Sequence, residues 1–221
     1  MEQSFEIKEF SIVIVAESHN PSLLNPDFLK TNRIVPSEWK LNRPPICVAA
    51  VAEVSFKGGV KITTQPDRVV FIERIDNNDL SEVQIQGISQ RYVSTLPHVN
   101  YTAVGINFKG HADRTALGDN YITDRIIKSG KWIDSSIGPI ETALKFTYQF
   151  KGSVCYLSVS NSYFSKPDKS KQPVILFDAN FHHRLPNSYD PDKAGVINNI
   201  INNWDNCLKN LDQLAGNILN S

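Results

Sequence analysis

Alternation of apolar and polar residues marks the strands of this chain. Phe10 to Glu17 alternates cleanly, and 101–109 and 142–150 repeat the same period of two, which is the side-chain period of a β-strand. Shorter apolar runs bounded by turn residues predict further strands over 46–54, 60–64, 68–73, 154–160 and 174–181. Tight turns join these strands, except that a polar loop, 165–172, joins the last two. We therefore expect two three-stranded antiparallel meanders, 46–73 and 142–181.

Helical spacing predicts the remaining elements. A mid-chain helix is expected from Ser81 to Leu96, and another over 120–129. Asn25-Pro26 is an N-cap followed by proline at the first helical position, so a short helix through Leu29 is predicted. A second such pair, Asp190-Pro191, opens one long C-terminal amphipathic helix. Its apolar stripe is Val196, Ile197, Ile200, Ile201, Trp204, Cys207, Leu208, Leu211, Leu214 and Ile218.

The predicted elements segregate along the chain and do not alternate, which is typical of an α+β fold with a mainly antiparallel sheet. A mid-chain helix and a long C-terminal helix would pack on that sheet. We expect one domain over 1–221, and the alternative is two lobes, 1–130 and 139–221. The proline-rich segment 18–45 is predicted to wrap the body, with Trp39 as its anchor.

Composition excludes several classes of protein. The 221 residues contain 23 Lys and Arg against 23 Asp and Glu, with 41% hydrophobic residues. This is too apolar for a disordered chain. The neutral balance argues against general nucleic-acid binding, which depends on uncompensated Lys and Arg.

The compartment is inferred from cysteine usage and hydropathy. Cys47, Cys155 and Cys207 are odd in number and form no C-x-x-C pair, which indicates neither a disulfide framework nor a zinc ribbon. No apolar run approaches the length of a membrane span, and the first ten residues do not resemble a secretory signal. A cytoplasmic location without a cofactor or membrane contact is therefore expected.

Histidines provide the best candidate for catalytic chemistry. The sequence contains no phosphate-binding glycine loop, no serine-hydrolase elbow and no zinc-protease helix motif. Histidine and aspartate near the ends of two predicted strands could hold a divalent ion that activates water, as in a metal-dependent hydrolase. These residues are His111, Asp113, Asp178, His182 and His183. No recognised ligand spacing supports the site. The favoured interpretation is therefore that His111 and Asp113 lie in a solvated loop, where Asp113 caps a turn, and that His182 and His183 form a polar strand end.

The polar face of the C-terminal helix is unusual because it carries asparagine where Lys and Glu are expected. Asparagine is a poor helix former, but an uncharged face costs less to bury against a partner. The functional interpretation is a subunit interface, and the alternative is general asparagine richness of the chain. The proposed interface residues are Trp39 with Asn198, Asn199, Asn202, Asn203, Asn206 and Asn210.

Three function classes remain open. The first is a non-enzymatic protein-interaction module, either a subunit of a cytoplasmic assembly or a homo-oligomer, since a neutral protein has little self-repulsion. The second is the metal-dependent hydrolase. The third is a small-molecule or nucleic-acid binding domain that uses the basic loop Lys166–Lys171. No family resemblance distinguishes them.

Overall fold

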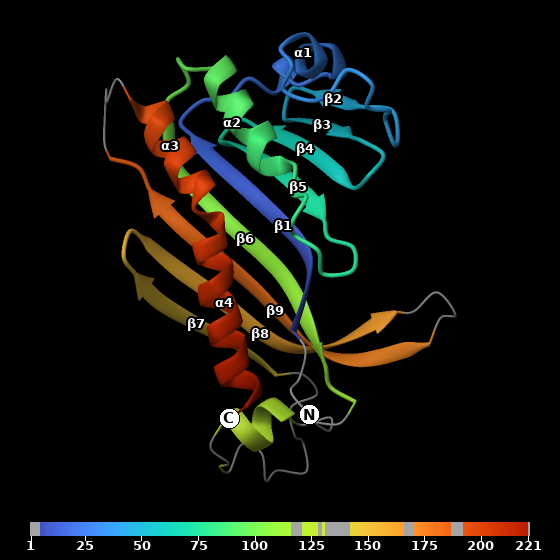
Figure 1. The fold of residues 1–221 in the computed structure, drawn as a ribbon, viewed down its shortest axis with the longest axis vertical. Coiled ribbons are helices and arrows are strands. Elements are labelled where there is room, and N and C mark those ends of the chain that lie inside the picture. Colours follow the sequence, from blue (N-terminus) through green and yellow to red (C-terminus); the bar gives the residue numbers. More distant parts are fainter. Residues whose placement is uncertain are drawn as a thin grey trace.

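The computed structural model describes residues 5–115, 121–127, 130, 142–165, 170–186 and 192–220. Its strands form one open antiparallel sheet in the order β2-β3-β4-β5-β1-β6-β9-β8-β7 (Figure 1). The fold is therefore α+β with a nine-stranded sheet in the described part of the chain. The strands are β1 Phe5–Ala16, β2 Ile46–Val48, β3 Val51–Ser55, β4 Val60–Gln65, β5 Arg68–Arg74, β6 Tyr101–Asp113, β7 Ala143–Phe150, β8 Ser153–Ser165 and β9 Lys171–Arg184.

The arrangement of the meanders differs from the expected one. The run 46–54 is two strands, β2 and β3, joined by a turn at Ala49-Ala50, so the first meander has four strands. β7, β8 and β9 form the expected second meander. β1 and β6 pair with each other between the two groups, and β6 pairs with β9 over 11 residues, Ala103 to Asp113. One continuous sheet thus contains strands from both segments of the two-lobe alternative, 1–130 and 139–221.

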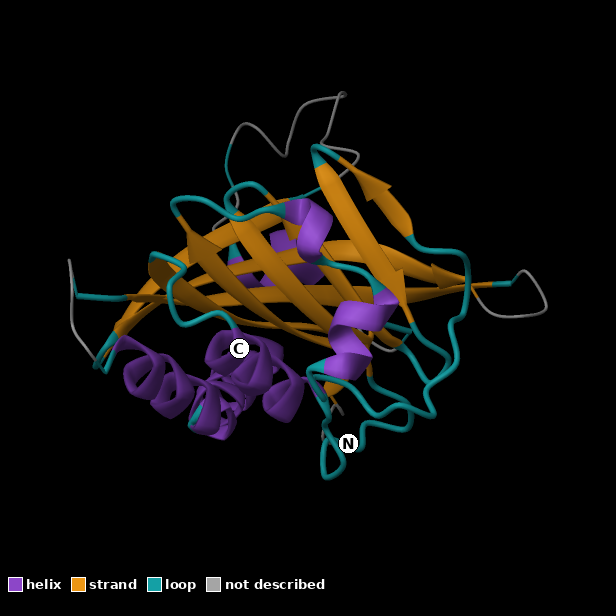
Figure 2. Ribbon diagram, turned by 90° about the horizontal axis from the view of Figure 1, so that it is seen from above, coloured by secondary structure: helices purple, strands orange, loops and turns teal. Residues whose placement is uncertain are grey.

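The helices form a layer on one face of the sheet, where α2 Ile85–Thr95, α3 Lys193–Asn202 and α4 Trp204–Leu219 lie (Figure 2). The short helix α1, Pro26–Thr31, is capped as predicted, because Asn25 Oδ1 accepts from the Phe28 amide at 2.8 Å. Phe28 also packs edge-on against Tyr92 of α2 at 6.3 Å, so α1 extends the same layer. Of the predicted helix 120–129, only 121–127 is described, and it contains one π-type turn, Ile122–Ile126.

The mid-chain helix begins later than the sequence indicated. Ser81 does not cap it, because the first helical residue is Ile85. The cap comes from β5: Glu73 Oε2 accepts from the amides of Gln84 at 2.8 Å and Ile85 at 3.0 Å. A buried carboxylate distant in sequence therefore satisfies donors that a local Ser or Asn usually satisfies.

The expected single C-terminal helix is two helices. α3 ends before Asn203, whose side-chain amide donates to the Asn199 carbonyl at 2.7 Å. Asparagine competes in this way with the backbone hydrogen bonds of a helix, and a new helix starts at Trp204. The predicted start at Asp190-Pro191 lies outside the described residues.

Aromatic packing between the sheet and α4 holds the centre of the core. The rings of Phe10 and Phe108 stack at 5.0 Å on neighbouring strands, and the Trp204 ring lies 5.0 Å from Phe10. The segment 18–45 packs on this helix-covered side too, since Ile34 and Val35 are buried and Trp39 contacts the Phe56 ring at 5.2 Å. Among the described helices, none has the length and apolarity needed to cross a bilayer.

Candidate binding surfaces

The face of the sheet opposite the helices, called the open face below, carries mainly polar side chains. Antiparallel register places one row of residues across five neighbouring strands on this face. The row consists of Ser11, Asn107, Asn180, Tyr156 and Thr147. Hydrogen bonds connect the polar side chains at one end of this row: the Asn180 side-chain amide donates to Asn107, and the Asn107 side-chain amide donates to the Ser11 hydroxyl at 3.3 Å. The centre of the open face is thus a fixed polar network, and its exposed aromatic, Tyr156, lies toward β7.

A row of alternating charge runs beside this network. Glu9, Lys109 and Asp178 are neighbours on β1, β6 and β9, and the Lys109 ammonium lies 3.5 Å from the Glu9 carboxylate. Burial raises the pKa of Asp178, and the positive charge of Lys109 opposes that shift. Asp178 therefore belongs to a charge ladder along the sheet.

The structure does not bring the proposed metal ligands together in the described part of the chain. His111 lies at the base of the β8–β9 hairpin with its ring stacked on Phe164 at 5.4 Å, and burial lowers its pKa. Asp113 accepts from the Thr115 amide at 2.7 Å and from the Gln172 side chain at 2.8 Å. Asp113 thus caps the turn that follows it, but the expected solvated loop is wrong, because both His111 and Asp113 belong to strand β6.

The two tandem histidines lie far from His111 and on opposite faces of β9. His182 is paired with Gly105, six residues along β6 from His111, which corresponds to roughly 20 Å at the rise of a strand. His183 points to the helix side, where its Nε2 is 3.8 Å from the Cys207 sulfur. Within the described ranges, no group of three or more His, Cys, Asp or Glu side chains is placed to hold a metal ion.

The asparagines of the C-terminal helices make several contacts within the molecule. Asn202 Oδ1 accepts from Gln86 at 2.9 Å and from Gln90 at 2.8 Å, both on α2. The Asn198 carbonyl accepts from Gln90 at 3.3 Å. Asn199 and Asn203 form the break between α3 and α4, and Asn206 and Asn210 lie on α4. Part of the asparagine face therefore joins α2 to α3.

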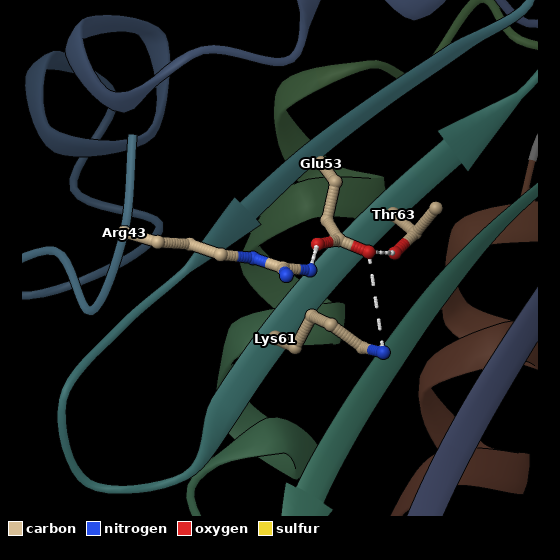
Figure 3. Close-up of polar contacts among 4 residues, drawn as sticks. All are labelled: Arg43, Glu53, Lys61 and Thr63. Atoms are coloured by element: carbon tan, nitrogen blue, oxygen red, sulfur yellow. Dashed lines mark hydrogen bonds and ion pairs between the residues drawn. The ribbon is translucent and has the colours of Figure 1, made fainter. Parts of the chain in front are cut away.

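A cationic pocket lies at the β3–β5 end of the sheet. Glu53 of β3 pairs with Arg43 and lies 4.0 Å from the Lys61 ammonium, and the Thr63 hydroxyl donates to it at 3.4 Å (Figure 3). Lys61 and Thr63 are on the adjacent strand β4, so the carboxylate holds two cations on one side of the hairpin.

The pocket has a volume of about 580 Å³ and contains more basic than acidic groups. Arg43 and Lys61 line it with Lys57 and Arg74, and Glu9 is the acidic residue of its lining. Lys57 and Arg74 form no ion pair with any residue that the structure describes. The other lining residues are Asn42, Ser55, Phe56, Gly58, Gly59 and Ile72.

The outer edge of β7 is the second candidate surface. Among the described strands, β7 is the last of the sheet and is eight residues long, whereas the strand at the other end, β2, has three residues and follows Pro44-Pro45. Short strands, prolines and charged residues protect a sheet edge from pairing, and of these features β7 has only one charged residue, Lys145. On its helix-covered side, four large side chains are half-buried, because α4 packs mainly on β1, β6 and β9. They are Leu144, Phe146, Tyr148 and Phe150.

Sequence reasoning missed both surfaces. A tight turn between the strands 46–54 and 60–64 was predicted, but the basic residues around it, Lys57 and Lys61, were the available signal for the pocket. The alternation of 142–150 predicted a strand without indicating that it ends the sheet. No family model and no curated protein matches this chain.

Proposed function

We propose that this protein is a non-enzymatic protein-interaction module that forms a homodimer through the outer edge of β7. The observation that carries this proposal is the eight-residue edge strand β7, whose outer side pairs with no other strand in the described part of the chain. A free strand edge presents a row of backbone donors and acceptors, and an added antiparallel strand satisfies them.

A second copy of the chain fits this edge because the strand is complementary to itself. Two antiparallel copies of β7 related by a two-fold axis at Thr147 place each threonine opposite the other. The flanking pairs are Lys145 with Gln149, Phe146 with Tyr148, and Leu144 with Phe150. Aromatic pairs and Thr–Thr pairs are favourable across strands, and this register places no two like charges opposite each other.

Net charge supports the same partner. The chain has equal numbers of basic and acidic residues, so two copies experience little overall repulsion. Tyr156, with about half of its surface exposed, lies beside Thr147 on the open face. Tyrosine is enriched in protein interfaces, so it would extend the contact beyond the backbone ladder.

Sedimentation equilibrium over a wide concentration range tests the proposal. The wild-type protein is expected to sediment with twice the chain mass. Thr147→Lys places two ammonium groups opposite each other at the axis and is expected to shift the protein to monomer. Gln65→Lys adds the same charge at an exposed position of the interior strand β4 and is expected to leave the dimer intact. A strictly monomeric wild type, or a Thr147→Lys dimer of unchanged affinity, would contradict the proposal.

A further inference from the structure

We infer that the cationic pocket at the β3–β5 end of the open face binds a small phosphate monoester, such as a sugar phosphate. The pocket is remote from the β7 edge, at the other end of the strand order. The inference therefore does not depend on the proposed dimer.

Charge is the first reason. Arg43, Lys57, Lys61 and Arg74 line one cavity in a protein whose total charge is zero. Glu53 pairs with Arg43 and lies near Lys61, whereas Glu9 lies opposite Arg74 across β1 and β5 and also pairs with Lys109 outside the pocket. Lys57 and Arg74 form no ion pair within the described chain. The four cations against these two carboxylates leave two positive charges in excess, which match a phosphate dianion, for which arginine and lysine are the usual protein ligands.

Preorganisation is the second reason. Glu53 fixes the Arg43 guanidinium and the Lys61 ammonium before a ligand arrives (Figure 3), which reduces the entropy lost on binding. Gly58 and Gly59 adopt positive φ angles of 95° and 92°. Their amides donate to no acceptor among the described residues, so the turn adds uncommitted N–H groups of the kind that bind phosphate oxygens.

The turn also needs its second glycine for steric reasons. A Cβ at Gly59 would lie 3.3 Å from the Arg74 Cβ, so the backbone of the turn closely approaches the strand that carries Arg74. Lys57 and Arg74 are thereby held on adjacent segments of the sheet. They are separated by 17 positions in the sequence, and only the β4–β5 hairpin brings them together.

The size and remaining lining define the ligand class. A volume of about 580 Å³ exceeds what a free phosphate fills and lies in the range of small-molecule sites. Asn42 and Ser55 supply neutral hydrogen-bonding groups for hydroxyls next to the phosphate. A polyhydroxylated phosphate monoester matches both the cationic residues and the neutral hydrogen-bonding residues of the pocket.

Isothermal titration calorimetry with glucose 6-phosphate, glucose and inorganic phosphate tests this inference. Glucose 6-phosphate is expected to bind, inorganic phosphate to bind more weakly, and glucose not to bind at concentrations up to roughly 10 mM. The double variant Lys57→Gln/Arg74→Gln is expected to weaken glucose 6-phosphate binding by roughly tenfold or more, as expected for lost charge-assisted hydrogen bonds.

The matched control is Lys209→Gln on α4, which removes an exposed cation far from the pocket and is expected to leave binding unchanged. Lys57 and Arg74 are exposed and not part of the core, so the variants are expected to fold. Circular dichroism of each variant verifies this. No glucose 6-phosphate binding by the wild type, or equal binding by the double variant, would overturn the inference.

Discussion

Glu73 on β5 accepts a hydrogen bond from the Ile85 backbone amide of α2 at 3.0 Å, and so fixes the start of that helix to the sheet. The same carboxylate oxygen accepts from the Gln84 amide. Both contacts are at least partly buried, so the loss of the acceptor leaves amide groups without a hydrogen bond. Glu73→Ala is expected to lower the free energy of unfolding by about 1–2 kcal/mol in urea denaturation. No measurable loss would show that the cap does not stabilise the fold.

The pH dependence of this cap has a definite sign. Burial raises the pKa of the Glu73 carboxyl, although the two amide hydrogen bonds oppose the shift. A carboxyl whose folded pKa lies above its unfolded value contributes stability at low pH and loses it as the pH rises through the folded pKa. The stability of Glu73→Gln relative to wild type should therefore increase from about pH 4.3 upward and then level off. A constant difference, or one that decreases with pH, would contradict this assignment.

Asn202 is predicted to be a structural residue. Its side-chain oxygen accepts from Gln86 and Gln90 and so joins α3 to α2. Asn202→Ala should lower the free energy of unfolding by about 1–2 kcal/mol. Asn210→Ala on α4 is the control: its side chain makes no hydrogen bond within the described part of the chain, and alanine favours helix. Equal effects of the two substitutions would contradict a specific role for Asn202.

The three cysteines should differ sharply in reactivity. Cys155 and Cys207 are buried, and burial raises the pKa of each thiol to about 12, so their thiolates are scarce at neutral pH. Cys47 is exposed on β2. Iodoacetamide should label Cys47 alone in the native protein and all three cysteines after unfolding, as measured by mass spectrometry. Rapid native labelling of Cys207 would instead indicate an activated thiol beside His183.

The local elements could be predicted where each residue's environment follows from its neighbours in sequence. The alternation in β1, β6 and β7 and the Asn25 cap of α1 are of this kind. The C-terminal stripe was correctly helical, but the break at Asn203 depends on side-chain hydrogen bonds that hydrophobic spacing does not encode.

The order of strands could not be predicted, because it depends on pairing between distant segments. β1 lies between β5 and β6, and Glu73 reaches α2 from a neighbouring strand of the sheet. The pocket has the same origin, since Lys57 and Arg74 meet only after the hairpins have formed. The predicted His and Asp cluster failed to assemble for a related reason: strand register separates His111 from His182 along β6 and β9.

Disulfide trapping at Thr147 tests the central claim most directly. In a Cys47→Ser background, Thr147→Cys places two thiols opposite each other at the proposed axis, within the Cα separation that disulfides require. Mild oxidation is expected to give a covalent dimer rapidly at low protein concentration, whereas Gln65→Cys on the interior strand β4 is expected to stay monomeric. Absence of a Thr147→Cys dimer, or equal crosslinking of the Gln65→Cys control, would contradict dimerisation through the β7 edge.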